Sequence, residues 1–320
     1  MPTLRTVTLN TGYDDCFTVH DLSWGGVGRS TAFRSVPSGK GISCARAAHA
    51  LGVPVRAYAL IGESDLPAYS GRLALEGLDH HLLAVPGATR HNLTLIDGSG
   101  HRVAAHFVAP GYTVDGPDAV RPLLQRLLED IEGGDVVTLN GSTPSGLPDD
   151  TWAGFARDTL EQGARVIVDA QGAAFREALA VTGVLAFKPN DEEILALPEV
   201  TAAAADAQVA LALRLLASTG VRIPLVSLGR RGASFLRDGE VVTMTCPVDG
   251  PVQSVMAGDA FVAGLVWGLF DGGSDEDCLR HALAAAAAHV AGLSGEALRV
   301  RAVENMAAVA ITAGSPHPAG

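Results

Sequence analysis

The strongest constraint on the fold is the alternation of short apolar runs with longer helical patterns along the chain. Segments such as 41–52 and 118–134 repeat apolar residues at three- and four-residue spacing, which is typical of amphipathic helices. This βαβ rhythm predicts an α/β protein whose doubly wound, mostly parallel sheet is flanked by helices. The expected strands are residues 6–10, 55–62, 135–141, 164–170, 183–190 and 223–229.

Two segments interrupt this rhythm, residues 11–36 and residues 88–112. In the second segment, alternating strand patterns flank the sequence "IDGSGH", which predicts a hairpin turn. We expect the two segments to pair as a small β-sheet lid lying over the main sheet. The α/β core would then consist of residues 1–10, 37–87 and 113–320.

Composition limits the classes of function that fit the chain. The 320 residues are 48% hydrophobic and 18% charged, so the chain can bury a large core. Its 23 basic and 35 acidic side chains give a formal charge of −12, and Lys and Arg form no block. We therefore expect no nucleic-acid partner, and any anion must be bound locally by a few placed groups.

The cysteines and the apolar segments indicate a reduced, cytoplasmic protein. The chain begins "MPTLRTVTLN", without a basic region followed by a long apolar one. Its most apolar helical stretch, residues 282–293, is too short for a membrane span, so no membrane segment is expected. No C-x-x-C pair occurs among the four widely spaced cysteines, Cys16, Cys44, Cys246 and Cys278.

Polar residues follow most of the expected strands. In doubly wound proteins ligands bind beyond the carboxyl ends of the strands, so these residues are candidates for a site. Turns also favour Asn, Gly, Ser and Pro, so each residue has a purely structural explanation as well. The residues are Asn10, Asn140, Gly141, Ser142, Asp169, Lys188, Pro189, Asn190, Ser227, Leu228 and Gly229.

Asp259 lies between a turn of small residues and the apolar run "AFVAGLVWGL". The backbone N–H groups of Ala257, Gly258 and Asp259 would be unpaired at a helix N-terminus, which makes that end an anion site. An acidic residue in a first turn also simply complements the helix dipole. In phosphoryl transfer, however, a carboxylate accepts the proton of the attacking hydroxyl while amides stabilise the transferred group. Other segments of the sequence are needed to distinguish these two explanations.

Eight segments occur in the order found in the PfkB (ribokinase-like) carbohydrate kinases. The sequence resembles this family from about residue 6 to about residue 295, and most closely its 1-phosphofructokinase and tagatose-6-phosphate kinase branch. The resemblance implies a ribokinase-like core with a β-sheet lid often used for dimerisation, ATP and Mg²⁺ as reactants, and a sugar or sugar phosphate as acceptor. The segments are "VTLN", "SGKGISCARAAHALG", "TRHN", "APG", "NGSTPSG", "KPNDEE", "VSLGRRGA" and "SVMAGDAFVAGL".

The resemblance implies catalytic and acceptor-binding roles for individual residues. Asp259 matches the family's general base, and the amides of Ala257 to Asp259 match its anion hole. Asp14 matches the carboxylate that holds sugar hydroxyls, and Lys40 matches a loop lysine that meets the substrate's phosphate. Arg90 and Asn92 in "TRHN" match a lid motif of phosphosugar kinases, and a guanidinium suits bidentate phosphate contact. The remaining acceptor-site matches are Gly39, Gly41, Ser43 and Ser142.

Further matches concern the nucleotide and the metal. Asn190 and Glu193 match the N-x-x-E element that orders Mg²⁺, with Glu193 acting through water. The same two residues fit an Asn-x-x-Glu capping arrangement, and both roles can hold together. The residues that fall where the family binds nucleotide are Lys188, Asn190, Ser227, Gly229, Gly232 and Gly258.

The sequence departs from the family pattern at three positions. Ser38 replaces the first glycine of the lysine loop, and Ser43 replaces the asparagine that follows it. Met256 replaces the first glycine of Gly-Ala-Gly-Asp and brings a bulky, flexible side chain beside the triphosphate path. We expect Met256 to have a negative φ and to pack against the nucleotide loop, because a positive φ would strain a residue other than glycine.

The resemblance favours an ATP-dependent kinase that converts fructose 1-phosphate to fructose 1,6-bisphosphate. Tagatose 6-phosphate and fructose 6-phosphate are the alternative acceptors. A second class is a catalytically weakened sensor that binds a sugar phosphate, which the three departures would permit. A kinase of nucleosides or unphosphorylated sugars is disfavoured by "TRHN". The expected partner is a phosphorylated ketose, with a possible homodimer formed through the lid.

Overall fold

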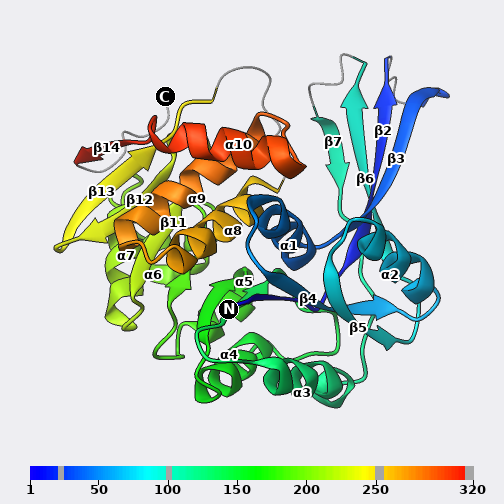
Figure 1. Ribbon diagram of the computed structural model, residues 1–320, viewed down its shortest axis with the longest axis horizontal. Helices are drawn as coiled ribbons and strands as arrows, with labels where there is room; N and C mark the ends of the chain where they lie inside the picture. Colours follow the sequence, from blue (N-terminus) through cyan, green and yellow to red (C-terminus); the bar gives the residue numbers. More distant parts are fainter. Residues whose placement is uncertain (21–24, 99–102, 249–255, 314–320) are drawn as a thin grey trace.

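The structure is a computed structural model in which residues 1–20, 25–98, 103–248 and 256–313 are described. Its strands form two sheets, a large one and a small one (Figure 1). The order in the large sheet is β14-β13-β12-β11-β10-β9-β8-β1-β4-β5, and the order in the small sheet is β3-β2-β6-β7.

The large sheet is parallel over most of its width. Its neighbouring parallel strands are β5 (Asp79–Val85), β4 (Val55–Gly62), β1 (Leu4–Thr8), β8 (Val136–Asn140), β9 (Arg165–Asp169), β10 (Ala186–Phe187) and β11 (Ile223–Ser227). Each of the six predicted strands overlaps one of them, so the predicted parallel α/β sheet is confirmed.

One edge of the large sheet is antiparallel, which the sequence analysis did not predict. There β12 (Ala233–Arg237) and β13 (Glu240–Thr245) form a hairpin, and β14 (Ala310–Ala313) pairs with β13. The hairpin turns at Asp238 and Gly239, whose φ values are 54° and 84°. Asp-Gly is the residue pair that two-residue hairpin turns favour, because both positions need a positive φ.

Helices cover both faces of the large sheet (Figure 1). Side chains of a strand alternate between the faces, so in β4 Ala57 and Ala59 join one apolar cluster while Tyr58 and Leu60 join another. The doubly wound arrangement is therefore confirmed. One face carries α1 (Lys40–Leu51), α2 (Leu66–Leu75), α8 (Ala257–Phe270), α9 (Asp275–Val290) and α10 (Gly295–Met306). The other carries α3 (Arg121–Asp130), α4 (Thr151–Glu161), α5 (Gly172–Ala178), α6 (Pro198–Thr201) and α7 (Gln208–Ser218).

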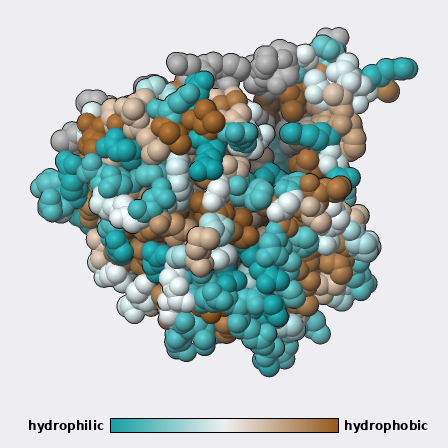
Figure 2. Space-filling model, viewed as in Figure 1, coloured by the Kyte–Doolittle hydropathy of each residue, from teal (hydrophilic) through white to brown (hydrophobic). Residues whose placement is uncertain are grey.

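The small sheet, here called the lid, projects from the main body (Figures 1 and 2). Its strands are β2 (Gly12–Val19), β3 (Ser30–Ser38), β6 (Arg90–Asp97) and β7 (Val103–Phe107). β2 lies between β3, to which it is antiparallel, and β6, to which it is parallel. β6 and β7 are antiparallel, as the predicted hairpin requires, but residues 99–102 of its turn lie outside the described residues.

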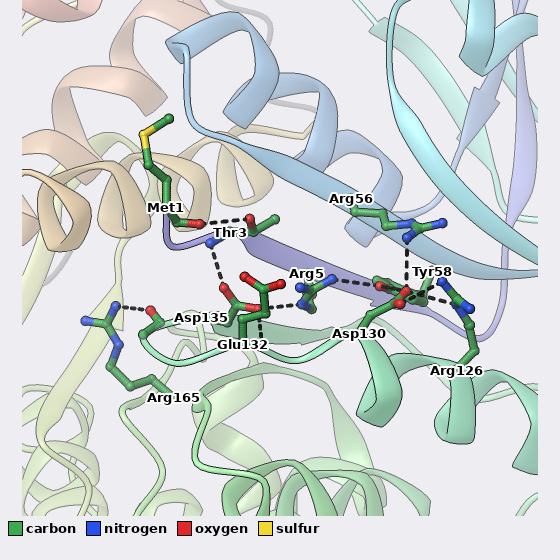
Figure 3. Close-up of polar contacts among 11 residues, drawn as sticks. Met1, Thr3, Arg5, Arg56, Tyr58, Arg126, Asp130, Glu132, Asp135 and Arg165 are labelled. Carbon is green, nitrogen blue, oxygen red and sulfur yellow. Dashed lines mark hydrogen bonds and ion pairs between the residues drawn. The ribbon is translucent and has the colours of Figure 1, made fainter.

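A buried polar network ties the amino ends of the central strands together (Figure 3). Arg5 on β1 donates from Nε to Asp135 Oδ2 at 2.7 Å and from Nη1 to the Tyr58 hydroxyl at 2.9 Å. That hydroxyl donates in turn to Asp130 Oδ2 at 2.6 Å, and Asp135 accepts the Thr3 amide at 2.8 Å. The network joins β1, β4, α3 and the start of β8, so the strands are held in register at the end opposite their carboxyl ends.

Within the described part of the chain, no helix combines the length and apolarity that a membrane span requires. All four cysteines lie in that part, and each is a free thiol.

Candidate active site

The strand order reverses at β1, and such a reversal leaves a crevice for ligands beyond the carboxyl ends of the strands. From β1 the chain passes through α1 to β4 on one side, and it later returns to β8 on the other side. The segments that follow β1 and β8 meet there, since Asn10 Nδ2 donates to Ser142 Oγ at 3.0 Å. The topology thus places the polar residues of the strand ends around one crevice.

Two glycines bring the start of α1 against the sheet. A side chain at Gly41 would place its Cβ 2.3 Å from Thr8 Oγ1 and 3.1 Å from Asn140 Nδ2, so only glycine fits. Gly39, the N-cap of α1, has φ 138°, a conformation that side-chain-bearing residues rarely adopt. The close approach of this loop directs Lys40, which lies between the two glycines, across the ends of β8 and β9.

Lys40 enters a cluster of charged side chains centred on Asp169. Its Nζ lies 3.1 Å from Asp169 Oδ1 and 3.4 Å from Glu193 Oε1, and Lys188 Nζ lies 3.3 Å from the same Asp169 oxygen. Burial alone would lower the pKa of Lys40, but the carboxylates of Asp169, Glu193 and Asp259 raise it. Lys40 is therefore held in its charged form at the carboxyl ends of the strands.

The sequence analysis placed Asp169 at a strand end but gave it no role. Burial acts to raise the pKa of Asp169, yet Lys188 and Lys40 outweigh burial and lower it, so the carboxyl is ionised. Its second oxygen, Oδ2, is buried and has no hydrogen-bond partner in the described part of the structure. The strand register shows its place in the site, because Asp169 pairs with Asn140 and Asn140 pairs with Thr8 at the carboxyl ends of three neighbouring strands.

Asp259 occupies the first turn of α8 and is only 6% exposed. Burial raises the pKa of its carboxyl well above the usual range, and Asp169 adds to the effect, whereas Lys40 and Lys188 oppose it. The Asp259 amide donates to the Met256 carbonyl at 3.1 Å, so it is engaged within the helix. The Ala257 and Gly258 amides lie in the first turn of the same helix, where backbone N–H groups suit an anion.

Met256 has φ 65° and ψ 8°, so the predicted negative φ is wrong. As the N-cap of α8, it must turn its carbonyl along the helix axis, where the carbonyl accepts the amides of Asp259 and Ala260. The left-handed conformation achieves this turn, at a cost of roughly 1–2 kcal/mol for a residue with a side chain. Its Sδ lies 3.1 Å from Ser43 Oγ, so two of the three departures from the family pattern contact each other across α1 and α8.

The lid contributes a carboxylate and a guanidinium to the crevice. Asp14 is 8% exposed and accepts from Asn92 Nδ2 at 2.8 Å on Oδ1 and from Ser38 Oγ at 2.6 Å on Oδ2. Arg90 donates to the carbonyl of Asn10 at 2.9 Å, and its Nε is buried without a hydrogen-bond partner in the described structure. Burial lowers the pKa of Arg90, with Asp14 among the groups that oppose it. This guanidinium retains donors for an anionic ligand.

Asn190 and Glu193 form the predicted capping arrangement at the short 3-10 helix Glu193–Ala196. Asn190 Oδ1 accepts the Glu193 amide at 2.7 Å, and Glu193 Oε2 accepts the Asn190 amide at 3.0 Å. The Asn190 side-chain oxygen is thus directed at the backbone. Glu193 carries its other oxygen towards Lys40 and the crevice.

The neighbouring loop contains Ser227, Gly229 and Gly232. Ser227 Oγ donates to the Pro189 carbonyl at 3.3 Å, which joins this loop to the segment containing Lys188. Gly232 has φ 88°, and a Cβ there would lie 1.9 Å from the Met244 carbonyl oxygen, so this glycine is required by the fold. Gly229 has φ 56° and open space beside its Cα, which suits the close approach of a ligand.

The donor set suits a magnesium ion that is held mainly by phosphate oxygens and water. No group of three or more His, Cys, Asp or Glu side chains in the described regions is arranged to hold a metal alone. Mg²⁺ usually keeps several waters and binds one or two carboxylates together with substrate phosphates. The unpartnered Asp169 Oδ2 and the carboxylate of Glu193 supply that kind of ligand.

Comparison with known proteins agrees with the fold and identifies the family. Residues 14–297 match the pfkB family carbohydrate kinases. The 1-phosphofructokinase of Xanthomonas campestris pv. campestris is 32% identical over 299 residues, which cover 92% of each chain. The 1-phosphofructokinase of Rhodobacter capsulatus is 34% identical over 266 residues, which cover 82% of each chain.

A solved structure shows the same architecture. Phosphofructokinase-2 of Escherichia coli in complex with fructose-6-phosphate superimposes with a TM-score of 0.86 at 28% identity, covering 96% of this chain and 99% of that one. The chain therefore belongs to the pfkB family of carbohydrate kinases and is an ATP-dependent phosphotransferase.

Proposed function

We propose that the protein phosphorylates fructose 1-phosphate to fructose 1,6-bisphosphate. The observation that carries this proposal is the buried Asp259 carboxyl with a raised pKa, next to two helix N-terminal amides and a paired lysine cluster. A strong base, an anion site and fixed positive charge are what transfer of a phosphoryl group to a hydroxyl requires. Two curated relatives named 1-phosphofructokinase favour this acceptor.

In the proposed reaction, Asp259 accepts the proton of the acceptor's free primary hydroxyl. The resulting oxygen forms a bond to the γ-phosphorus of ATP, the bond to the bridging oxygen breaks, and ADP leaves with that electron pair. The amides of Ala257 and Gly258 stabilise the charge on the transferred group. Lys40, whose ammonium lies beside Asp169 and Glu193, stays assigned to the phosphate of the acceptor, as the resemblance implies.

The acceptor's own phosphate is also assigned to Arg90, whose partners are backbone carbonyls and whose guanidinium retains free donors. Asp14 and Asn92 would hold sugar hydroxyls, since they form one hydrogen-bonded unit at the base of the lid. The remaining proposed acceptor contacts are Gly39, Ser43 and Ser142.

We assign the nucleotide to the loops after β10 and β11, through Lys188, Asn190, Ser227, Gly229, Gly232 and Gly258. A bound Mg²⁺ would neutralise charge on the phosphates. Glu193, through water, and Asn190 are the proposed metal residues, to which the structure adds the unpartnered oxygen of Asp169.

Fructose 6-phosphate is the second candidate acceptor, favoured by the structural match to the Escherichia coli phosphofructokinase-2 in complex with that sugar. The discriminating experiment is an ADP-release assay with Mg-ATP across a panel of free and phosphorylated ketoses. We expect the highest kcat/KM with fructose 1-phosphate. A higher value with fructose 6-phosphate would replace the proposed acceptor, and no turnover with any sugar would favour the sensor.

Two variants test the assigned roles in the same assay. Asp259→Asn keeps the shape of the side chain but removes the base, so kcat should fall about 10²–10⁴-fold. Arg90→Ala should cost about 2–5 kcal/mol in kcat/KM for the phosphorylated acceptor and leave the KM for ATP nearly unchanged. An equal loss with unphosphorylated ketoses would make Arg90 a structural residue.

We further propose a homodimer formed through the lid, with the lid at residues 11–36 and 88–112 and the core in the remaining ranges. One lid face is apolar, because Phe17, Phe33 and Leu95 share a register row and the Phe17 and Phe33 rings lie 4.7 Å apart. Phe33 is 58% exposed and Phe107 48% exposed, which is unusual for aromatic side chains unless another surface covers them. Phe33→Asp should convert a dimer into a monomer in sedimentation equilibrium.

A further inference from the structure

Ser38 lies on the lid face that carries the proposed acceptor-binding groups. In the register of the lid, Gly12 pairs with Ser38 on one side and Arg90 on the other, and Asp14 pairs with Asn92. Side chains two residues apart on a strand lie on the same face, so these residues share one face. Gly12 has no side chain, and the Arg90 side chain lies against it, since a Cβ at Gly12 would be 3.2 Å from Arg90 Cγ.

The Ser38 hydroxyl is committed to Asp14. Its Oγ donates to Asp14 Oδ2 at 2.6 Å, a buried and charge-assisted hydrogen bond of the short, strong kind. Asn92 Nδ2 donates to the other oxygen, Oδ1, and the Asn92 Oδ1 atom accepts the Ala109 amide, which fixes the orientation of its side chain. Asp14 is therefore held by one donor on each oxygen.

Because of this arrangement, Ser38 and Asp14 can only accept hydrogen bonds from a ligand. A serine hydroxyl has one hydrogen, so after donating to Asp14 its oxygen can only accept further bonds. The carboxylate oxygens of Asp14 are likewise acceptors only. A ligand group that binds there must donate a hydrogen, which a sugar hydroxyl does and an ether, a fluorine or a missing hydroxyl does not.

The backbone of Ser38 is fixed independently of its side chain. Ser38 is the last residue of β3 and pairs with Gly12, and its carbonyl accepts the Tyr69 hydroxyl at 2.7 Å. Removing the hydroxyl therefore leaves the strand and the buried tyrosine contact in place. Its effect can be separated from a folding defect.

We propose that Ser38 is a specificity-determining residue that, together with Asp14, selects acceptors by a hydroxyl that donates a hydrogen to this pair. The inference rests on the proposed function, since it concerns the acceptor of that reaction. It assigns a role to a residue where the family resemblance has a glycine. The ligand class is a phosphorylated ketose with a free hydroxyl at the contacted carbon.

The test compares the wild type with Ser38→Ala, Ser38→Gly and Ser35→Ala in the ADP-release assay. Ser35 is the matched control because it lies on the other face of the same strand, opposite Asp15. A hydrogen bond to a charged group contributes about 1.5–3 kcal/mol, which is about 10–100-fold in an equilibrium constant. Both Ser38 variants should therefore raise the KM for fructose 1-phosphate at least about tenfold, with kcat and the KM for ATP changed less than threefold.

Acceptor analogues then distinguish contact from a structural role. The panel contains fructose 1-phosphate analogues in which one hydroxyl at a time is replaced by hydrogen or fluorine. The wild type should lose about tenfold in kcat/KM with one deoxy analogue and with its fluoro partner, and Ser38→Ala should show no further loss with those two. Uniform losses across the panel, an unchanged KM or a lower KM would each refute the role of Ser38. Absence of wild-type turnover with any phosphorylated ketose would instead refute the proposed function.

Discussion

The backbone conformation of Met256, at the start of α8, can be tested by measuring the free energy of unfolding of two variants. Its φ of 65° lies in the left-handed region, which costs a residue with a side chain roughly 1–2 kcal/mol and glycine almost nothing. Met256→Gly and Met256→Ala both remove the thioether and its contact with Ser43. The difference in unfolding free energy between the two variants therefore isolates the backbone contribution.

The expected difference follows from two opposing effects. Glycine removes the left-handed cost of roughly 1–2 kcal/mol but gives the unfolded chain extra entropy of about 0.4–1 kcal/mol. Met256→Gly should thus be more stable than Met256→Ala by about 1 kcal/mol, or about 2 °C in Tm for a chain of this size. If φ were negative, alanine would be the more stable variant by the entropy difference alone.

The measurement is equilibrium urea unfolding of the two variants, with thermal scans beside it. A Met256→Ala variant that is more stable than Met256→Gly by about 0.4–1 kcal/mol would refute the left-handed conformation. Turnover of Met256→Gly adds a second readout, because its KM for ATP should change less than about tenfold if the side chain lies against Ser43 and outside the phosphate path. A hundredfold rise in kcat would show that the side chain blocks that path.

Three further predictions concern charged groups. Since burial raises the pKa of Asp259, the folded protein keeps this proton where the unfolded chain, with a pKa of about 3.9, has lost it, so wild-type stability falls as pH rises. The Tm of Asp259→Asn relative to the wild type should therefore rise as the pH increases above about 4. A Tm difference that does not change with pH would contradict the raised pKa of Asp259. Asp135→Asn leaves Arg5 buried without its ion pair and should cost about 3–5 kcal/mol in urea unfolding, whereas Glu304→Gln in an exposed pair should cost less than about 1 kcal/mol. Removing divalent ions with EDTA should abolish turnover, and Asp169→Asn should raise the Mg²⁺ concentration needed to restore half of it about tenfold or more; an unchanged Mg²⁺ requirement would exclude Asp169 from the metal site.

Local patterns predicted the parallel part of the sheet because each buried strand there is a short apolar run between helical segments. The antiparallel edge escaped the analysis although Asp238-Gly239 is a recognisable hairpin signal. Its strands follow one another without an intervening helix, so the βαβ rhythm gave no reason to look for them. The capping of Glu193 by Asn190 was predictable, since both residues lie within one turn.

The contacts of Ser38, Ser43 and Met256 could not be predicted from the sequence. Ser43 and Met256 are 213 residues apart, and their contact depends on how α1 and α8 pack. The positive φ at Met256 likewise depends on the start of α8, where its carbonyl accepts the amides of Asp259 and Ala260. Residue preference alone favours a negative φ for methionine, and here tertiary structure overrides that preference.

The structure also supplies a reason, independent of family resemblance, for choosing Asp259 and not Asp169 as the base. Both carboxyls are buried, and the charge of Asp169 contributes to the raised pKa of Asp259. Lys188 and Lys40 contact Asp169 and lower its pKa, so this carboxylate is a weak proton acceptor. Asp259 has no such direct contact among the described ion pairs, and burial raises its pKa. When two neighbouring carboxyls have pKa values pushed in opposite directions, the one with the raised pKa is suited to proton transfer and the other to fixed negative charge. Asp169 therefore orders the lysines, and Asp259 is the carboxyl that we propose as acceptor of the proton.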